Sequence, residues 1–121
     1  MTIQNQSSPV VLVVEDEILI RDCIVAHLQE AGFDVIAAAD AEQAFREFEH
    51  QPCVTTVFND VRMPGRFDGL SLAAKVVKLR PDVQVIVTSG LGLPNGAVPA
   101  GADFLPKPYD CTALSGLIKA A

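Results

Sequence analysis

Carboxylates stand at the ends of two apolar, β-branched runs in this sequence. Glu15 and Asp16 follow the run at residues 10–14, and Asp60 follows the run at residues 54–58. If both runs are parallel strands, their carboxyl ends meet at one edge of a sheet, where open α/β sheets bind ligands. Acids packed together repel one another, and a hard cation such as Mg²⁺ or Mn²⁺ relieves that repulsion. Position alone also fits three solvated loop acids.

A lysine and a threonine add groups that could hold a phosphoryl oxygen. Lys107 lies between two prolines, and this rigid corner would aim its ammonium toward the acids. Pro108 also makes a cis bond after Lys107 possible. Thr88 ends the apolar run at residues 83–87 and can donate from its hydroxyl. An ordinary surface lysine and a strand-end threonine remain the alternative. With a nucleophilic carboxylate and no His or Cys base, the set suits phosphoryl transfer onto an acid.

The elements that position these residues alternate along the chain. The predicted strands are residues 10–14, 33–37, 54–58, 83–87 and 102–105. The predicted helices are residues 17–31, a segment capped by Asp40 with Gln43 three residues later, a segment from the Asp68 cap to Arg80, and residues 109–120. Such alternation predicts an α/β domain, a parallel sheet with helices on both faces.

The segment at residues 91–101 breaks this rhythm. It holds two prolines and three glycines. Proline removes a donor from the helical ladder, and glycine is unfavourable in a helix interior. We therefore expect at most one helical turn there, near residues 96–98.

Bulk composition narrows the classes of function. The chain has 121 residues, a net charge of -6 and three cysteines that are far apart in sequence. Its acidity argues against direct nucleic-acid binding, and no apolar run is long enough for a membrane span. Residues 1–9 are predicted to be a loose tail, not a signal peptide, and residues 10–121 one domain. The odd cysteine count suits a reducing cytosol, with each cysteine expected to serve packing.

Five motifs together resemble the response regulator receiver domains, a family similar to the chemotaxis regulators. They are Val13-Val-Glu-Asp-Glu17, Asn59-Asp-Val-Arg-Met-Pro64, Asp68-Gly-Leu70, Ile86-Val-Thr-Ser89 and Phe104-Leu-Pro-Lys-Pro-Tyr109. They cover essentially the whole chain after the tail. The resemblance implies a flavodoxin-like, doubly wound, five-stranded parallel sheet of order 2-1-3-4-5.

The resemblance also implies roles for the residues at the acidic site. Asp60 would be the phosphoacceptor, receiving a phosphoryl group from the phosphohistidine of a histidine kinase. Asp16, with Glu15 beside it, would be the Mg²⁺-binding acid pair, and the backbone carbonyl of Arg62 a further ligand. Such a domain assists its own Mg²⁺-dependent phosphorylation and dephosphorylation and is not otherwise an enzyme.

Further roles concern the response to phosphorylation. By resemblance, Thr88 is the switch hydroxyl, Lys107 bonds the phosphoryl group and Phe104 is the rotating aromatic. Arg62 and Gly90 stand at positions that influence access of attacking water. The implied function is a cytoplasmic, phosphorylation-dependent switch in a two-component system or phosphorelay. Its partners would be a sensor histidine kinase or phosphotransfer protein and an unknown downstream protein, with the chain a monomer or weak dimer.

One departure from the family leaves alternatives open. The interval between Thr88 and Phe104 is a few residues shorter than usual, so the helix before the fifth strand is predicted to be shortened or missing. The output surface, which uses this helix in many relatives, would then be remodelled. A binding module of the same fold that no longer switches is therefore the alternative. A Mg²⁺-dependent phosphatase with an aspartyl nucleophile is less favoured, because Arg62 stands where such enzymes have a second Asp.

Overall fold

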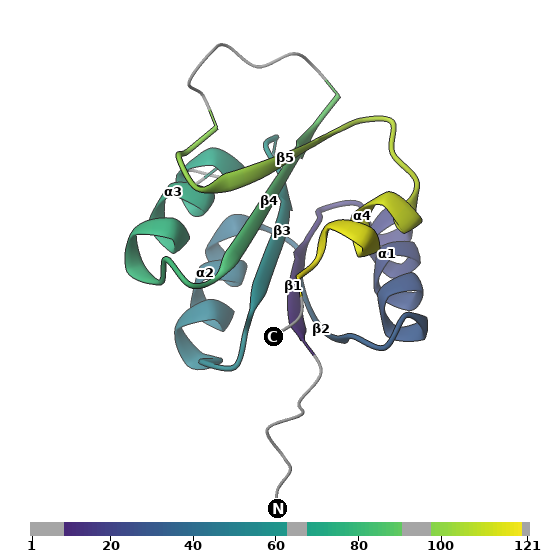
Figure 1. Ribbon diagram of the computed structural model, residues 1–121, viewed down its shortest axis with the longest axis horizontal. Helices are drawn as coiled ribbons and strands as arrows, with labels where there is room; N and C mark the ends of the chain where they lie inside the picture. Colours follow the sequence, from purple (N-terminus) through teal and green to yellow (C-terminus); the bar gives the residue numbers. More distant parts are fainter. Residues whose placement is uncertain (1–8, 63–67, 91–97, 120–121) are drawn as a thin grey trace, which may run out of the picture.

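The fold is a five-stranded parallel sheet with helices on both faces, seen in a computed structural model that describes residues 9–62, 68–90 and 98–119 (Figure 1). The strand order is β2-β1-β3-β4-β5, which confirms the predicted flavodoxin-like order. The strands are β1 (Val10–Val14), β2 (Asp34–Ala38), β3 (Thr56–Asp60), β4 (Gln84–Ser89) and β5 (Ala102–Pro106). The helices are α1 (Ile18–Glu30), α2 (Ala41–His50), α3 (Gly69–Leu79) and α4 (Cys111–Leu117).

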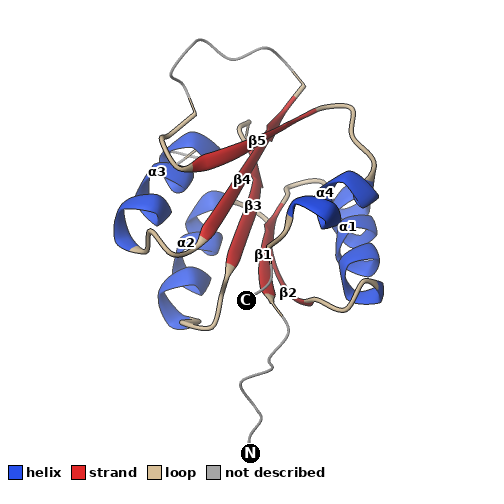
Figure 2. Cartoon of the chain, viewed as in Figure 1, coloured by secondary structure: helices blue, strands red, loops and turns tan. Residues whose placement is uncertain are grey.

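The helices divide between the two faces of the sheet, α2 and α3 on one and α1 and α4 on the other (Figure 2). Side chains alternate between these faces along each strand. In β1, Leu12 and Val14 join the core on the α2/α3 face, while Val11 and Val13 join the core on the α1/α4 face. This burial on both faces explains why β1 is a continuous apolar run and not an alternating one.

Three aspartates cap the helices that follow strands β2, β3 and β5. Asp40 accepts from the backbone N–H of Gln43 at 2.8 Å, as predicted, and Gln43 accepts from the N–H of Ala39 at 2.9 Å. Asp68 and Asp110 accept in the same way at the starts of α3 and α4. Each such cap stabilises its helix by about 1 kcal/mol.

Several element bounds differ from the predicted ones. Strand β3 ends at Asp60, two residues later than predicted, and β4 continues through Thr88 to Ser89. The reason is cross-strand pairing, since Asp60 pairs with Thr88 in the β3–β4 ladder. Helix α4 begins at Cys111 and not at residue 109 because Asp110 is its cap, and it ends at Leu117, where Ile118 turns to extended backbone. The carboxylate of Asp60 therefore belongs to the last strand residue and not to the loop after it.

Two predictions concern parts of the chain that are not described. The predicted tail lies outside the described residues except for Pro9, and the predicted turn at residues 96–98 lies outside them except for Val98. Residues 98–101, which are described, contain no helix. Within the three described ranges, no helix has both the length and the apolar character needed to cross a membrane.

Candidate functional site

Strand alternation sends four of the predicted site residues to the same face of the sheet. Packing on the α1/α4 face includes Val13, Phe58, Ile86 and Leu105. The residues two positions further along each chain segment are Glu15, Asp60, Thr88 and Lys107. Because side chains repeat with a period of two, these four continue the α1/α4 face at its carboxyl edge. The sheet therefore replaces apolar core with polar groups at this edge of the α1/α4 face.

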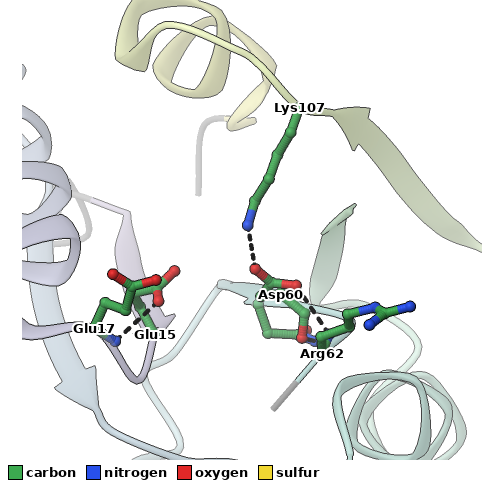
Figure 3. Close-up of polar contacts among 6 residues, drawn as sticks. Glu15, Glu17, Asp60, Arg62 and Lys107 are labelled. Carbon is green, nitrogen blue, oxygen red and sulfur yellow. Dashed lines mark hydrogen bonds and ion pairs between the residues drawn. The ribbon is translucent and has the colours of Figure 1, made fainter. Parts of the chain in front are cut away.

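Asp60 is held by one donor on each carboxylate oxygen. The residue is only 8% exposed. Its Oδ2 atom binds the Lys107 ammonium, and its Oδ1 atom accepts from the backbone N–H of Arg62 at 2.9 Å (Figure 3). The bond to Asp60 is the main cause that raises the pKa of Lys107. The carboxylate is thus fixed in orientation and faces a permanent positive charge.

Glu15 and Asp16 lie across the same pocket from Lys107. The pocket has a volume of about 400 Å³, and its lining is Glu15, Asp16, Glu17, Asp60, Arg62, Gly90 and Lys107. Glu15 is buried, and its Oε2 atom accepts from the N–H of Glu17 at 3.0 Å. Burial, followed by the neighbouring carboxyls of Asp16 and Asp60, raises the pKa of Glu15. Asp16 itself is exposed.

The donor chemistry of this pocket fits a hard divalent cation. The pKa of Glu15 is raised first by burial and then by the neighbouring carboxyls, and a cation would offset both effects. Within the described part of the chain, no three His, Cys, Asp or Glu side chains are gathered closely enough to hold a metal ion. Mg²⁺ commonly binds through one or two carboxylates and keeps several waters, so a tight cluster of three is not required. The pocket thus offers the oxygen ligands that Mg²⁺ prefers.

The Thr88 hydroxyl is buried beside the acidic pocket. Thr88 is 1% exposed and stands opposite Asp60 in the strand register. Its Oγ1 atom has no hydrogen-bond partner among the described residues. A buried hydroxyl without a partner is unfavourable by about 1–3 kcal/mol. An oxygen-rich group on Asp60 would offer this hydroxyl an acceptor.

Phe104 and Gly90 lie at the margins of the site. Phe104 pairs with Val87, is 38% exposed, and alternates to the face opposite Lys107. It does not line the acidic pocket. A Cβ atom on Gly90 would lie 3.7 Å from the Cδ atom of Lys107, an ordinary contact. A methyl group at position 90 would therefore fit and would narrow the pocket.

Gly69 supports the end of β3, a role that the sequence analysis missed. A Cβ atom there would overlap the carbonyl oxygen of Asp60 and lie 2.6 Å from the Asn59 amide nitrogen. Asn59 Nδ2 donates to the Gly69 carbonyl at 3.0 Å and to the Asp60 carbonyl at 3.2 Å. The first residue of α3 therefore lies directly against the backbone of Asp60. The motif Asp68-Gly-Leu70 and a buried Asn within an apolar run were the available signals.

Two other supporting residues had no predicted role. Tyr109 packs edge-on against Phe58, with ring centroids 5.8 Å apart, and burial raises its pKa to about 12. Its packing anchors the connection after Lys107, whose bond to Pro108 is cis. Arg21 Nη1 donates to the carbonyl of Glu15 at 2.9 Å, so α1 is tied to the end of β1. Neither contact has a local signature, because each joins residues brought together only by the fold.

The fold and site define a doubly wound α/β domain with an acidic, lysine-containing pocket at the carboxyl edge of its sheet. The sequence matches the response regulator receiver domain family over residues 11–119, and the chain belongs to that family. It is the receiver domain of a two-component response regulator.

Two relatives and one solved structure illustrate the similarity. The transcriptional regulatory protein AruR of Pseudomonas aeruginosa is 42% identical over 115 residues, 84% of this chain and 44% of that protein. A putative response regulator NtrX-like protein of Rickettsia felis is 37% identical over 116 residues, 92% of this chain and 24% of that protein. A chain of the CheX–CheY–BeF3–Mg²⁺ complex from Borrelia burgdorferi aligns with a TM-score of 0.79 and 26% identity, covering 92% of this chain and 90% of that one. The chain thus spans less than half of the two curated relatives.

Proposed function

We propose that this domain is a phosphorylation switch that accepts a phosphoryl group on Asp60 from the phosphohistidine of a histidine kinase or phosphotransfer protein. The supporting observation is the double anchoring of Asp60, whose two carboxylate oxygens meet the Lys107 ammonium and the Arg62 N–H. This arrangement presents a nucleophile and neutralises developing charge, which are the main requirements of phosphoryl transfer.

The transfer forms one bond and breaks one bond. An Asp60 carboxylate oxygen attacks phosphorus, the N–P bond of the phosphohistidine breaks, and the electron pair returns to the imidazole nitrogen. Lys107 can then follow the negative charge from the carboxylate to the phosphoryl oxygens as a mobile point charge. Gly90 leaves room beside Lys107 for the incoming group.

The residues that would hold Mg²⁺ are Glu15, Asp16 and Asp60, with the backbone carbonyl of Arg62. When bound, the ion neutralises charge on the phosphoryl oxygens. Glu15 would contribute a buried carboxylate fixed by the N–H of Glu17, and Asp16 an exposed one. The relation to the Borrelia burgdorferi chain in a BeF3–Mg²⁺ complex supports this assignment.

Thr88 would be the residue that responds to phosphorylation of Asp60. The group brings about two negative charges and three acceptor oxygens to Asp60. The buried Thr88 hydroxyl, which has no acceptor among the described residues, would be drawn toward it. Phe104, exposed on the other face, would respond to movement of β4 and β5. A downstream protein that prefers this state shifts the equilibrium.

Arg62 and Gly90 are proposed to set the lifetime of the phosphoryl group. Both line the pocket, and they stand two residues after Asp60 and Thr88 respectively. Gly90→Ala would place a methyl group near Lys107 without a clash. The phosphoryl half-life should therefore change while the extent of labelling does not.

Intact-mass analysis with a small acyl-phosphate donor tests the proposal. The wild-type protein should gain one phosphoryl group in the presence of Mg²⁺ and none with a chelator. Asp60→Asn should abolish this gain. Asp34→Asn, an exposed acid at the opposite end of the sheet, is the matched control and should label normally.

Two outcomes would count against the proposal. Stoichiometric labelling of Asp60→Asn would remove Asp60 from its role. Labelling of the wild type without amide NMR shifts at Thr88 and Lys107 on adding beryllofluoride and Mg²⁺ would favour a binding module that does not switch.

A further inference from the structure

Two cysteines line a second cavity, which shares Lys107 and Gly90 with the acidic pocket but is otherwise separate from it. This cavity has a volume of about 450 Å³ and lies between α1 and the connection from β5 to α4. Its lining includes Cys23, Ile24, Tyr109 and Cys111. The sequence predicted that all three cysteines serve packing. That prediction is wrong for Cys23 and Cys53, which are exposed.

The register of the two helices places these thiols opposite each other. His27 Nε2 and Ser115 Oγ are 3.3 Å apart and join α1 to α4. Cys23 stands four residues before His27, and Cys111 stands four residues before Ser115. Residues four apart lie on the same face of a helix. The pair Cys23 and Cys111 is therefore the next contact along the same helix–helix interface.

The environment of Cys111 agrees with this placement. Burial, followed by the nearby Cys23 thiol, raises the pKa of the Cys111 thiol. Cys111 also packs against the buried core of the α1/α4 face. Cys23, in contrast, is exposed on α1 and is open to small molecules from solvent.

We propose that Cys23 and Cys111 are a redox modification site that closes into a reversible disulfide between α1 and α4. This inference does not depend on phosphoryl transfer. Disulfides in reducing compartments are usually transient and redox-sensing. The bond would bridge one side of the cavity that Lys107 and Tyr109 also line, and so restrict the connection that positions Lys107.

The co-reactant is a low-molecular-weight disulfide such as oxidised glutathione. The exposed Cys23 thiolate attacks one sulfur, the S–S bond breaks, and one thiolate leaves and takes a proton. Cys111, after losing its proton to water, attacks the Sγ atom of Cys23 and releases the second thiol. Two protein thiols are oxidised by two electrons, and one disulfide is reduced to two thiols. The raised pKa of Cys111 makes it the slower, resolving thiol.

Cys53 provides an internal control. It is the third cysteine, exposed between α2 and β3, and so belongs to the part of the chain that covers the opposite face. Cys53→Ser prevents glutathione adducts and unintended disulfides from forming at this third thiol. The variant Cys53→Ser is therefore the parent for the test, with Cys23→Ser and Cys111→Ser each added to it.

The experiment is oxidation by glutathione disulfide followed by intact-mass and peptide analysis without reduction. The parent should lose two hydrogens per chain and yield a linked peptide containing Cys23 and Cys111, reversed by dithiothreitol. Each double variant should instead gain one glutathione. Closure should be about tenfold or more faster in native than in unfolded protein, because the fold raises the effective thiol concentration. The oxidised parent should also have a higher Tm.

Three results would overturn the inference. These are two glutathione adducts on the parent with no internal link, a disulfide that joins two chains, or closure no faster in the native than in the unfolded protein. Labelling of Asp60 is not part of any readout, so failure here and failure of the proposed phosphorylation are separate results.

Discussion

The two faces of the sheet are built from the same strands but differ in what they bury. Among the described residues, the α2/α3 face holds fourteen buried hydrophobic residues, including Leu12, Leu72 and Val85. The α1/α4 face holds eight in the same described ranges, among them Leu28 and Leu114, and its carboxyl edge is polar. The larger core is expected to contribute more to stability, since stabilisation scales with buried apolar area. The smaller core leaves an edge where charge can be placed.

Within a single strand, alternate side chains point to opposite faces of the sheet. Residues that stabilise the larger core and residues that form the polar site can therefore come from the same strand. On β3, Val57 faces the larger core, while Phe58 and then Asp60 face the other side. Helix α4 is only seven residues long and begins after the connection that contains Lys107. The α1/α4 face can therefore change locally while the opposite core remains packed.

The largest expected effect comes from cavity formation on the α2/α3 face. Leu72→Ala should lower the free energy of unfolding by about 2–5 kcal/mol, because Leu72 is fully buried. Labelling of the folded protein by an acyl phosphate should be unchanged. Denaturant unfolding and initial labelling rates measure the two quantities.

Leu114→Ala on the α1/α4 face is the matched variant. It creates a similar cavity but also loosens α4 behind the Lys107 connection, so labelling should slow as well. Equal slowing in Leu72→Ala would show that the two faces are not separate.

Gly69→Ala should have the next largest effect. The added methyl group would overlap the carbonyl oxygen of Asp60, so α3 or β3 must shift. Overpacking of this kind lowers stability by about 1–3 kcal/mol. Thermal unfolding measures the loss. Gly116→Ala is the control, because its Cβ atom would meet nothing within 4 Å, and it should stabilise α4 slightly. If Gly69→Ala leaves the Tm unchanged, the contact between the start of α3 and the end of β3 accommodates the added methyl group without loss of stability.

Thr88→Val should separate stability from switching. The hydroxyl has no partner among the described residues, so its removal should raise the free energy of unfolding by about 1 kcal/mol. The amide NMR response to beryllofluoride should weaken at the same time. Thr55→Val is the control, because its hydroxyl bonds both the N–H and the carbonyl of Val10, and it should destabilise. If Thr88→Val destabilises, the hydroxyl is already satisfied in the unmodified protein.

Glu15→Gln should have the smallest effect, and one that depends on pH. The folded-state pKa of Glu15 is raised, so folding binds the proton more tightly. Its contribution is fully present below about pH 4.5 and is lost as pH rises through the folded-state pKa. Without Mg²⁺, the variant should match the wild type at low pH and be more stable at neutral pH. Added Mg²⁺ should stabilise the wild type more.

Urea unfolding across pH measures this difference. Glu30→Gln, at the exposed end of α1, is the control and should not gain stability over the wild type at neutral pH in this way. A constant difference at all pH values would mean that charge at Glu15 is not the cause.

Much of the fold follows from local patterns. The continuous apolar runs, the Asp40 and Asp68 caps and the alternation of strands and helices predicted every described element in order. The predicted ends of β3 and β4 were wrong, because Asp60 and Thr88 extend their strands by pairing with each other. Pairing between distant segments has no local signature.

The residue types at the site were determined by the sequence, whereas their contacts were decided by the tertiary structure. Asp60 at a strand end and Lys107 between prolines were visible as candidates, because chemical type and turn residues are local properties. The Gly69 junction, the packing of Tyr109 on Phe58 and the meeting of Cys23 with the Cys111 side of α4 were not. Each depends on how closely two backbones approach after helices pack on the sheet, and only the complete set of contacts fixes that distance.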